Sequence, residues 1–216
     1  MTVTVTVTVT AVAVGRPRDV PGPGEDRTTS TAIWKDRTAA RVAVVGDNLA
    51  GDEQADREHH GGPDKAVYAY GTSDLAWWSG EMGRDLDPQT FGQNLTVDGA
   101  DLRDAVVGER WRVGSAVLEV AQPRIPCFKL GLRADDPTMP RRFTAAGRPG
   151  VYLRVVAVGE VGAGDAVIVT DRPAHGVTVG EAFGVYLHRR DAAARLLDAP
   201  QLPASWHRWA RERLPG

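Results

Sequence analysis

The single cysteine of the chain, Cys127, lies in a stretch rich in residues that can do chemistry. Arg124 precedes it and Lys129 follows it closely. Cations near a thiol favour the thiolate, which is the form that attacks electrophiles and binds metals. A lone cysteine is most often a small buried hydrophobe. The two cations weaken that interpretation without removing it, because an extended chain points alternate residues to opposite faces.

Two prolines, Pro123 and Pro126, frame this stretch. Proline fixes φ and disfavours helix at the residue before it, so residues 122–130 are predicted to form a stiff, extended loop. The preceding residues 111–120 have the length and β-branched content of a hairpin or a pair of strands. A stiff loop that leaves a strand can hold a side chain still. We therefore expect Cys127 to serve as a soft ligand.

Two adjacent histidines, His59 and His60, precede a Gly-Gly-Pro sequence. Neighbouring histidines in a strand point in opposite directions, and no cysteine or carboxylate pattern completes a zinc site. A turn histidine that hydrogen-bonds to the backbone is one interpretation. The alternative is one imidazole that faces a pocket as an acid, a base or a hydrogen-bond donor.

Several cations lie in or beside predicted loops: Lys35, Lys65, Arg124, Lys129 and Arg148. Each alone is most often a solvated surface charge. Together they suit a ligand with phosphate oxygens, which arginine contacts bidentately and lysine contacts as a point charge. The chain contains no nucleophile elbow, Walker loop or kinase motif, so those mechanisms have no support.

The composition bounds the class of protein. The 216 residues are 42% hydrophobic and 25% charged, enough for a sizeable packed core, with 26 Lys and Arg against 28 Asp and Glu. This balance gives no reason to expect nucleic acid or an anionic membrane as a partner. No apolar run has the length of a bilayer span, and the alternating Thr and Val at the start do not resemble a signal peptide. One cysteine excludes an internal disulfide framework and favours the cytoplasm.

Alternation and β-branched residues predict a mainly β chain. We expect strands at residues 2–14, 32–35, 40–45 and 66–70, with loops at 18–31 and 46–64. Residues 151–158 and 166–170 read as a hairpin around a glycine-rich turn, and since no helix follows the glycines we do not interpret them as a phosphate loop. A short helix is expected at 73–78, with Ser73 as its N-cap.

The composition changes after residue 172. Residues 178–181 have the spacing of a capping box, and short helices are expected at 182–187, 191–197 and 203–214. Three short helices bury little surface alone, so they should dock on the β domain or on a second subunit. The predicted divisions are an N-terminal strand extension at 1–10, a main domain at 11–172 and a three-helix tail at 173–216.

Four sequence motifs, at residues 51–56, 60–67, 91–96 and 122–130, occur in an order that resembles the MOSC domain family and, within it, the bacterial YiiM group. The resemblance implies a mainly β, barrel-like fold with short helices and a C-terminal three-helix appendage. It also implies binding of a pyranopterin molybdenum cofactor. Cys127 matches the family's metal ligand, and Lys35 matches a lysine near the cofactor.

Other motif positions correspond less directly. His60, Asn94 and Arg124 match positions expected around the pterin or the metal. The family usually has Phe-Gly-Glu-Asn-Leu where this chain has Gln93 in place of the glutamate. Glutamine loses the charge and keeps an acceptor, so an acid or base role at this position is in doubt.

The leading hypothesis is an oxidoreductase that reduces N-hydroxylated compounds, such as N-hydroxylated purines, to amines. Cys127 would bind the metal, and His60 or Asn94 would orient the substrate. Since no flavin or nicotinamide fingerprint is visible, electrons should come from a separate reductase. The alternatives are a cofactor or sulfur carrier that uses Cys127, and a binder that has lost its metal. A homodimer is possible.

Overall fold

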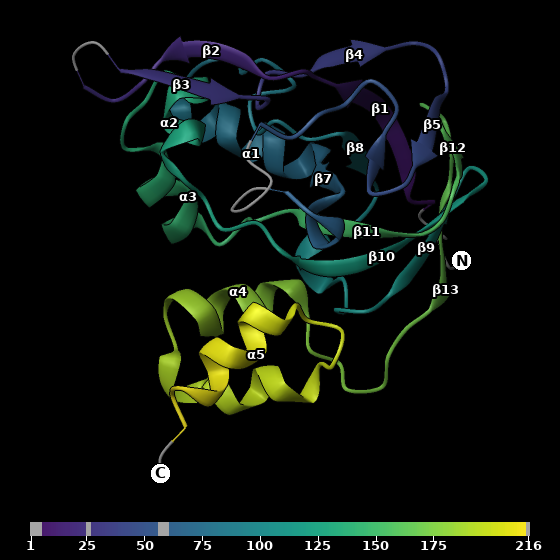
Figure 1. Ribbon diagram of the computed structural model, residues 1–216, viewed down its shortest axis with the longest axis vertical. Coiled ribbons are helices and arrows are strands. Elements are labelled where there is room, and N and C mark those ends of the chain that lie inside the picture. Colours follow the sequence, from purple (N-terminus) through teal and green to yellow (C-terminus); the bar gives the residue numbers. More distant parts are fainter. Residues whose placement is uncertain (1–5, 25–26, 56–60, 215–216) are drawn as a thin grey trace.

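The computed structural model describes residues 6–24, 27–55 and 61–214 (Figure 1). The strands are β1 Thr8–Val14, β2 Arg18–Pro21, β3 Thr28–Thr31, β4 Asp36–Thr38, β5 Val42–Val45, β6 Asn48–Leu49, β7 Val67–Gly71, β8 Leu95–Asp98, β9 Arg110–Val113, β10 Ala116–Pro123, β11 Val151–Ala157, β12 Gly159–Val161 and β13 Val167–Asp171. The α-helices are α1 Thr72–Met82, α2 Phe128–Ala134, α3 Met139–Ala146, α4 Val179–Leu187 and α5 Ala204–Arg211, and the 3-10 helices are η1 Pro63–Lys65, η2 Leu102–Asp104 and η3 Arg190–Asp198. The predicted fold class, mainly β with short helices and a helical tail, is confirmed.

One eight-stranded sheet, ordered β13-β9-β10-β11-β7-β8-β1-β4, forms the body of the molecule. Its strands pair antiparallel except β7 and β8. The sheet curls until β1 reaches β13, where Thr8 bridges Ala166 and the Val167 N–H donates to the Val7 carbonyl at 2.8 Å. This contact gives the sheet its barrel-like closure.

The buried strands explain why the sheet has a continuous core. All five residues of β7 are buried, and β10 is buried along nearly its whole length. Their valines, leucines and alanines pack with those of β1, β8 and β11 in one apolar cluster. β-Branched residues suit such strands because they pack well on a pleated surface. The predicted strands at 40–45, 66–70 and 111–120 are confirmed, the last as β9 and β10.

Two predictions near the N-terminus are wrong. Residues 18–31, predicted as a loop, contain the hairpin of β2 and β3, in which the four residues of each strand pair. Thr28–Thr31 supplies β-branched residues. Of the Pro and Gly residues that suggested a loop, Pro21 ends β2 and residues 22–24 lie at the turn. Residues 32–35, predicted as a strand, have no regular structure, and the strand follows at Asp36–Thr38. Of the predicted strand at 2–14, residues 2–5 lie outside the described ranges.

The predicted hairpin of residues 151–158 and 166–170 is also wrong. Both segments are strands, but β11 pairs with β10 and β7 while β13 pairs with β9. The glycine-rich connection contains β12, which pairs with β5 in a separate sheet. Alternation marked the strands correctly. Partner choice depends on tertiary packing that local patterning does not contain.

Two helix boundaries differ from expectation. Helix α1 begins at Thr72 after Gly71, and no side chain caps it, so Ser73 is not its N-cap. The stiff loop at 122–130 is shorter than predicted, because β10 continues to Pro123 and α2 begins at Phe128. Lys129 therefore lies on a helix. No helix in the described parts of the chain has the length and apolar character needed to cross a membrane.

The tail helices α4, η3 and α5 pack against the β domain next to β10 and β11, and His188 at the end of α4 reaches the Thr144 carbonyl of α3 at 3.3 Å (Figure 1). Of the two predicted docking modes, the structure shows docking on the chain's own β domain. Thr178 caps α4 by accepting from the Glu181 N–H at 3.1 Å, as the capping-box spacing predicted. The predicted second helix is a 3-10 helix. The predicted domain divisions stay predictions.

Candidate functional site

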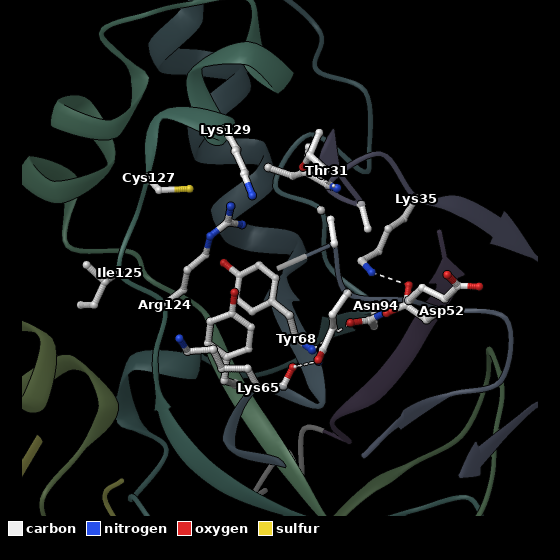
Figure 2. A pocket seen from close by; sticks show the side chains of 17 residues that line it. Thr31, Lys35, Asp52, Lys65, Tyr68, Asn94, Arg124, Ile125, Cys127 and Lys129 are labelled. Atoms are coloured by element: carbon white, nitrogen blue, oxygen red, sulfur yellow. Dashed lines mark hydrogen bonds and ion pairs between the residues drawn. The ribbon is translucent and has the colours of Figure 1, made fainter. Parts of the chain in front are cut away.

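A pocket opens between the chain segments that carry the four sequence motifs (Figure 2). It holds about 690 Å³ of empty space, a figure that includes space open to solvent. The lining residues are Thr31, Ala32, Ile33, Lys35, Asp52, Glu53, Gln54, Ala55, Lys65, Tyr68, Gly92, Asn94, Arg124, Ile125, Cys127, Lys129 and Tyr152.

One side of the pocket, here called the Cys127 wall, consists of Arg124, Cys127 and Lys129. Their thiol, guanidinium and ammonium groups point toward one another (Figure 2). Cys127 is partly exposed and immediately precedes α2, whose first turn carries Lys129. Within the described ranges, neither cation of this wall has a carboxylate at ion-pair distance. The wall therefore presents uncompensated positive charge beside a thiol.

Arg124 is buried, and aromatic rings hold it in place. Its guanidinium lies 5.0 Å from the ring centroid of Tyr68 and 5.9 Å from that of Phe143, and it donates to the Phe91 carbonyl. Burial opposes its charge, but the neighbouring tyrosines and Cys127 raise the pKa of Arg124 overall. It therefore stays protonated, and a fixed, desolvated guanidinium is a strong anion contact.

The opposite side, here called the Asp52 wall, consists of Lys35 and Asp52. Their side chains are 8% and 3% exposed and form an ion pair. Asp52 also accepts from the Gly15 N–H at 2.8 Å, which joins this wall to β1. Burial lowers the pKa of Lys35, and this effect outweighs the opposing influence of Asp52. The charge of Lys35 is thus compensated from within the protein.

Close backbone contact fixes the loop before β8. Gly92 has φ of +65°, and a Cβ at this position would lie 2.7 Å from Ile33 Cγ1 and 2.8 Å from the Ile33 carbonyl oxygen. Glycine is required here for both reasons. The contact brings the loop of Ile33 against the loop that leads to Asn94, and both loops line the pocket.

Asn94 holds the barrel together more than it faces a ligand. Its Oδ1 accepts from the Tyr68 N–H at 3.0 Å, and its Nδ2 donates to the Ala13 carbonyl at 3.2 Å. Both ends of the amide are therefore committed to backbone. Gln93 is fully buried, does not line the pocket, and donates to the Pro88 carbonyl at 2.6 Å. A carboxylate cannot donate that bond, so Gln93 acts here as a structural donor.

The structure brings together six of the predicted site residues in this pocket: Lys35, Lys65, Asn94, Arg124, Cys127 and Lys129. His60 lies outside the described residues. Arg148 does not line the pocket but pairs with buried Asp74 at 2.5 Å and lies 4.7 Å from the centroid of the Trp77 ring. Their roles toward a ligand stay predictions.

Sequence reasoning missed several polar residues of the pocket, among them Asp52, Gln54, Tyr68 and Tyr152. The first two belong to the motif at residues 51–56, which was the available signal. Tyr68 and Tyr152 face each other across β7 and β11 with ring centroids 5.0 Å apart. Burial raises the pKa of both phenols, so both keep their protons at neutral pH. Tyr68 donates to the Pro149 carbonyl at 2.8 Å.

The few possible metal ligands in the pocket limit how a metal can bind. The described part of the chain contains no cluster of three or more His, Cys, Asp or Glu residues placed to hold a metal ion. Cys127 supplies one thiol ligand, beside cations that suit an anionic group. Such a pocket fits a metal that arrives with most of its ligands attached and with a phosphate, and the residues present therefore fit a pyranopterin cofactor.

The fold and the pocket define the class: a barrel-like β protein whose small-molecule pocket is lined by a thiol and cations. Comparisons with known proteins identify the family. The family model described as MOSC domain matches residues 56–168. The chain belongs to the MOSC domain family. MOSC domains in general are associated with binding of the molybdenum cofactor.

Several known proteins are similar to the chain over most of its length. It is 33% identical to the uncharacterized protein YflK of Bacillus subtilis, covering 84% of each chain. It is 33% identical to protein YiiM of Escherichia coli, covering 85% of this chain and 84% of YiiM. A protein named reductase from Gibberella moniliformis is 30% identical over 81% of this chain, which spans 32% of that protein.

Solved structures agree with this assignment. The crystal structure of YiiM from Geobacillus stearothermophilus superposes with a TM-score of 0.79 at 28% identity, covering 97% of this chain and all of that one. The similarity therefore includes the three-helix tail as well as the barrel. The chain is thus a MOSC domain protein of the kind represented by YiiM.

Proposed function

We propose that this protein binds a pyranopterin molybdenum cofactor in the pocket and reduces N-hydroxylated compounds, such as N-hydroxylated purines, to amines. The observation that carries the proposal is the Cys127 wall, which places one thiol beside two cations without carboxylate partners in the described structure. Family membership and the similarity to a protein named reductase support it.

The residues of the pocket have distinct tasks in this proposal. Cys127 would hold the metal as a thiolate, a soft ligand suited to a sulfur-rich centre. Arg124 and Lys129 would contact the phosphate, the first with a fixed guanidinium and the second as a point charge. When bound, the cofactor supplies the two-electron redox chemistry that cleavage of an N–O bond requires.

The overall reaction consumes two electrons and two protons and yields the amine and water. The electrons would come from a separate reductase, since the sequence shows no flavin or nicotinamide fingerprint. Tyr152 would offer a hydrogen bond to the substrate, because its phenol lines the pocket and burial raises its pKa. Tyr68 is less suited to that task, since its hydroxyl already donates to Pro149.

The test is the molybdenum and pterin content of protein purified from a cofactor-replete host, with Cys127→Ser as the matched variant. We expect bound molybdenum and pterin in the wild type and loss of molybdenum in the variant. Turnover is then measured on an N-hydroxylated purine with dithionite-reduced viologen as electron donor. A wild type without molybdenum would overturn the proposal. Bound molybdenum without turnover would favour the carrier function.

A further inference from the structure

Two of the connections between the three-helix tail and the pocket run through Asp64. Asp64 is the central residue of η1, and its neighbour Lys65 lines the pocket. The Gln54 side chain, which also lines the pocket, donates to the Lys65 carbonyl at 3.1 Å. The turn Pro63–Lys65 is therefore part of the pocket wall, and two separate routes connect it to the tail.

The first route runs through Gln122. The indole N–H of Trp206 in α5 donates to Gln122 Oε1 at 2.7 Å, and Gln122 Nε2 donates to the Asp64 carbonyl at 3.3 Å. An indole can only donate and a carbonyl can only accept, so the amide fits in one orientation. Gln122 is buried at the end of β10, two residues before Arg124.

The second route runs through Arg154 in β11. Its guanidinium donates to the carbonyl of Gln201 in the tail at 2.9 Å and pairs with the Asp64 carboxylate at 2.6 Å. It also donates to Glu119 in β10 at 2.9 Å, which fixes its position on the sheet. The backbone carbonyl and the carboxylate of Asp64 are thus each joined to the tail through a single side chain.

A third contact is apolar. Ile125 lines the pocket between Arg124 and Cys127, and it also packs against the hydrophobic cluster of the tail. That cluster contains Trp206 together with residues of α4 and η3. The tail therefore touches both the turn that carries Lys65 and the loop that carries Cys127.

We propose that the three-helix tail positions the pocket wall: Trp206 fixes the amide of Gln122, and Gln122 with Arg154 fixes the turn Pro63–Lys65. Gln122 and Trp206 are positioning residues, because they act on the pocket through Asp64. The inference concerns the protein itself and holds whichever ligand the pocket binds.

The test is amide hydrogen exchange of the full-length, cofactor-free protein, with Trp206→Phe compared with Trp209→Phe. Both indoles lie 4.6 Å from the Tyr186 ring centroid, but in the described structure only Trp206 uses its N–H. Loss of that donor leaves Gln122 Oε1 buried and unpaired. We expect exchange at residues 64–66 to quicken about tenfold in Trp206→Phe and to stay at the wild-type rate in Trp209→Phe.

Gln122→Glu provides a second test that leaves the tail in place. Glutamate keeps the acceptor for Trp206 and loses the donor to the Asp64 carbonyl. We expect faster exchange at residues 64–66, with wild-type exchange in α5. If Trp206→Phe and Gln122→Glu both leave the turn at the wild-type rate, the tail only adds stability and the inference is wrong. Since no cofactor is present, this outcome is independent of the proposed function.

Discussion

The two walls of the pocket carry similar cations in opposite electrostatic settings. On the Asp52 wall, Lys35 is buried against a carboxylate that is itself held by the Gly15 N–H. On the Cys127 wall, Arg124 contacts a backbone carbonyl and aromatic rings, and Lys129 has no carboxylate at ion-pair distance in the described ranges. The position of the carboxylates, more than the number of cations, decides where an anion can bind.

The difference assigns separate tasks to the two walls. A buried ion pair adds little net stability, but loss of one partner is costly because the other charge stays buried. The Asp52 wall therefore acts as a structural unit that joins Lys35 to β1. The Cys127 wall has unused donor capacity, which a ligand with phosphate oxygens can fill. Four predictions test this division.

The largest effect is expected at the Asp52 wall. Lys35→Met should lower the free energy of unfolding by about 3–5 kcal/mol, because Asp52 remains buried without its partner. Asp52→Asn should cost less, because it keeps an acceptor for Gly15 and because Lys35, with its lowered pKa, can lose its proton. Urea unfolding of both single variants and the double variant gives the interaction energy between Lys35 and Asp52. Additive costs in the double variant would contradict a coupled pair.

The next effect is expected at Arg124. Arg124→Gln should reduce retention of the molybdenum cofactor about 10²-fold, since two charge-assisted hydrogen bonds of about 1.5 kcal/mol each are lost. The measurement is molybdenum content after equilibrium dialysis. A cofactor retained as in the wild type would mean that the anion binds elsewhere.

Arg148→Gln is the matched control for that variant. Arg148 is a partly buried arginine that pairs with Asp74 outside the pocket. We expect the control to retain the cofactor and to be less stable, because Asp74 is left buried. Loss of cofactor in Arg148→Gln would instead support the sequence-based prediction that Arg148 binds it.

The sequence predicted strands well and their partners poorly. Short apolar runs with β-branched and aromatic residues located β7, β9 and β10, because such residues are typical of buried strands. It could not show that β11 and β13 pair with different neighbours, since pairing depends on how the whole sheet closes. The β2–β3 hairpin was missed because its short strands contain polar residues that are typical of loops.

The site was predicted to a similar degree. The motifs located Cys127 and Arg124, because ordered motifs mark segments that converge, and the family resemblance located Lys35. They did not show that the Asn94 amide is occupied by backbone or that Arg148 pairs with Asp74, because hydrogen-bond partners far apart in sequence leave no local pattern. The sequence around Tyr152 predicts a strand but gives no indication that this tyrosine lines the pocket.

A smaller effect is expected from pH. Burial lowers the pKa of Lys35 below its ordinary value of 10.5, so between the two values the unfolded chain binds more protons than the folded one. Stability should therefore rise with pH in this window, by at most about 1.4 kcal/mol per pH unit. Above pH 10 it should fall, because the pKa values of buried Tyr68 and Tyr152 are raised. The measurement is urea unfolding as a function of pH, and the Lys35→Met, Asp52→Asn double variant should not show this increase in stability. If the double variant shows the same increase as the wild type, a titratable group other than Lys35 causes it.

The smallest effect is expected at Lys129. This lysine is partly exposed at the first turn of α2, so solvent screens its charge more than that of Arg124. Lys129→Met should weaken cofactor retention about fivefold, corresponding to about 1 kcal/mol, with an unfolding midpoint close to the wild type. Equilibrium dialysis at low and high salt checks the cause, because the difference from wild type should shrink as salt rises. A difference that does not depend on salt would mean that Lys129 contributes through packing of its side chain, and the Cys127 wall would then bind anions mainly through Arg124.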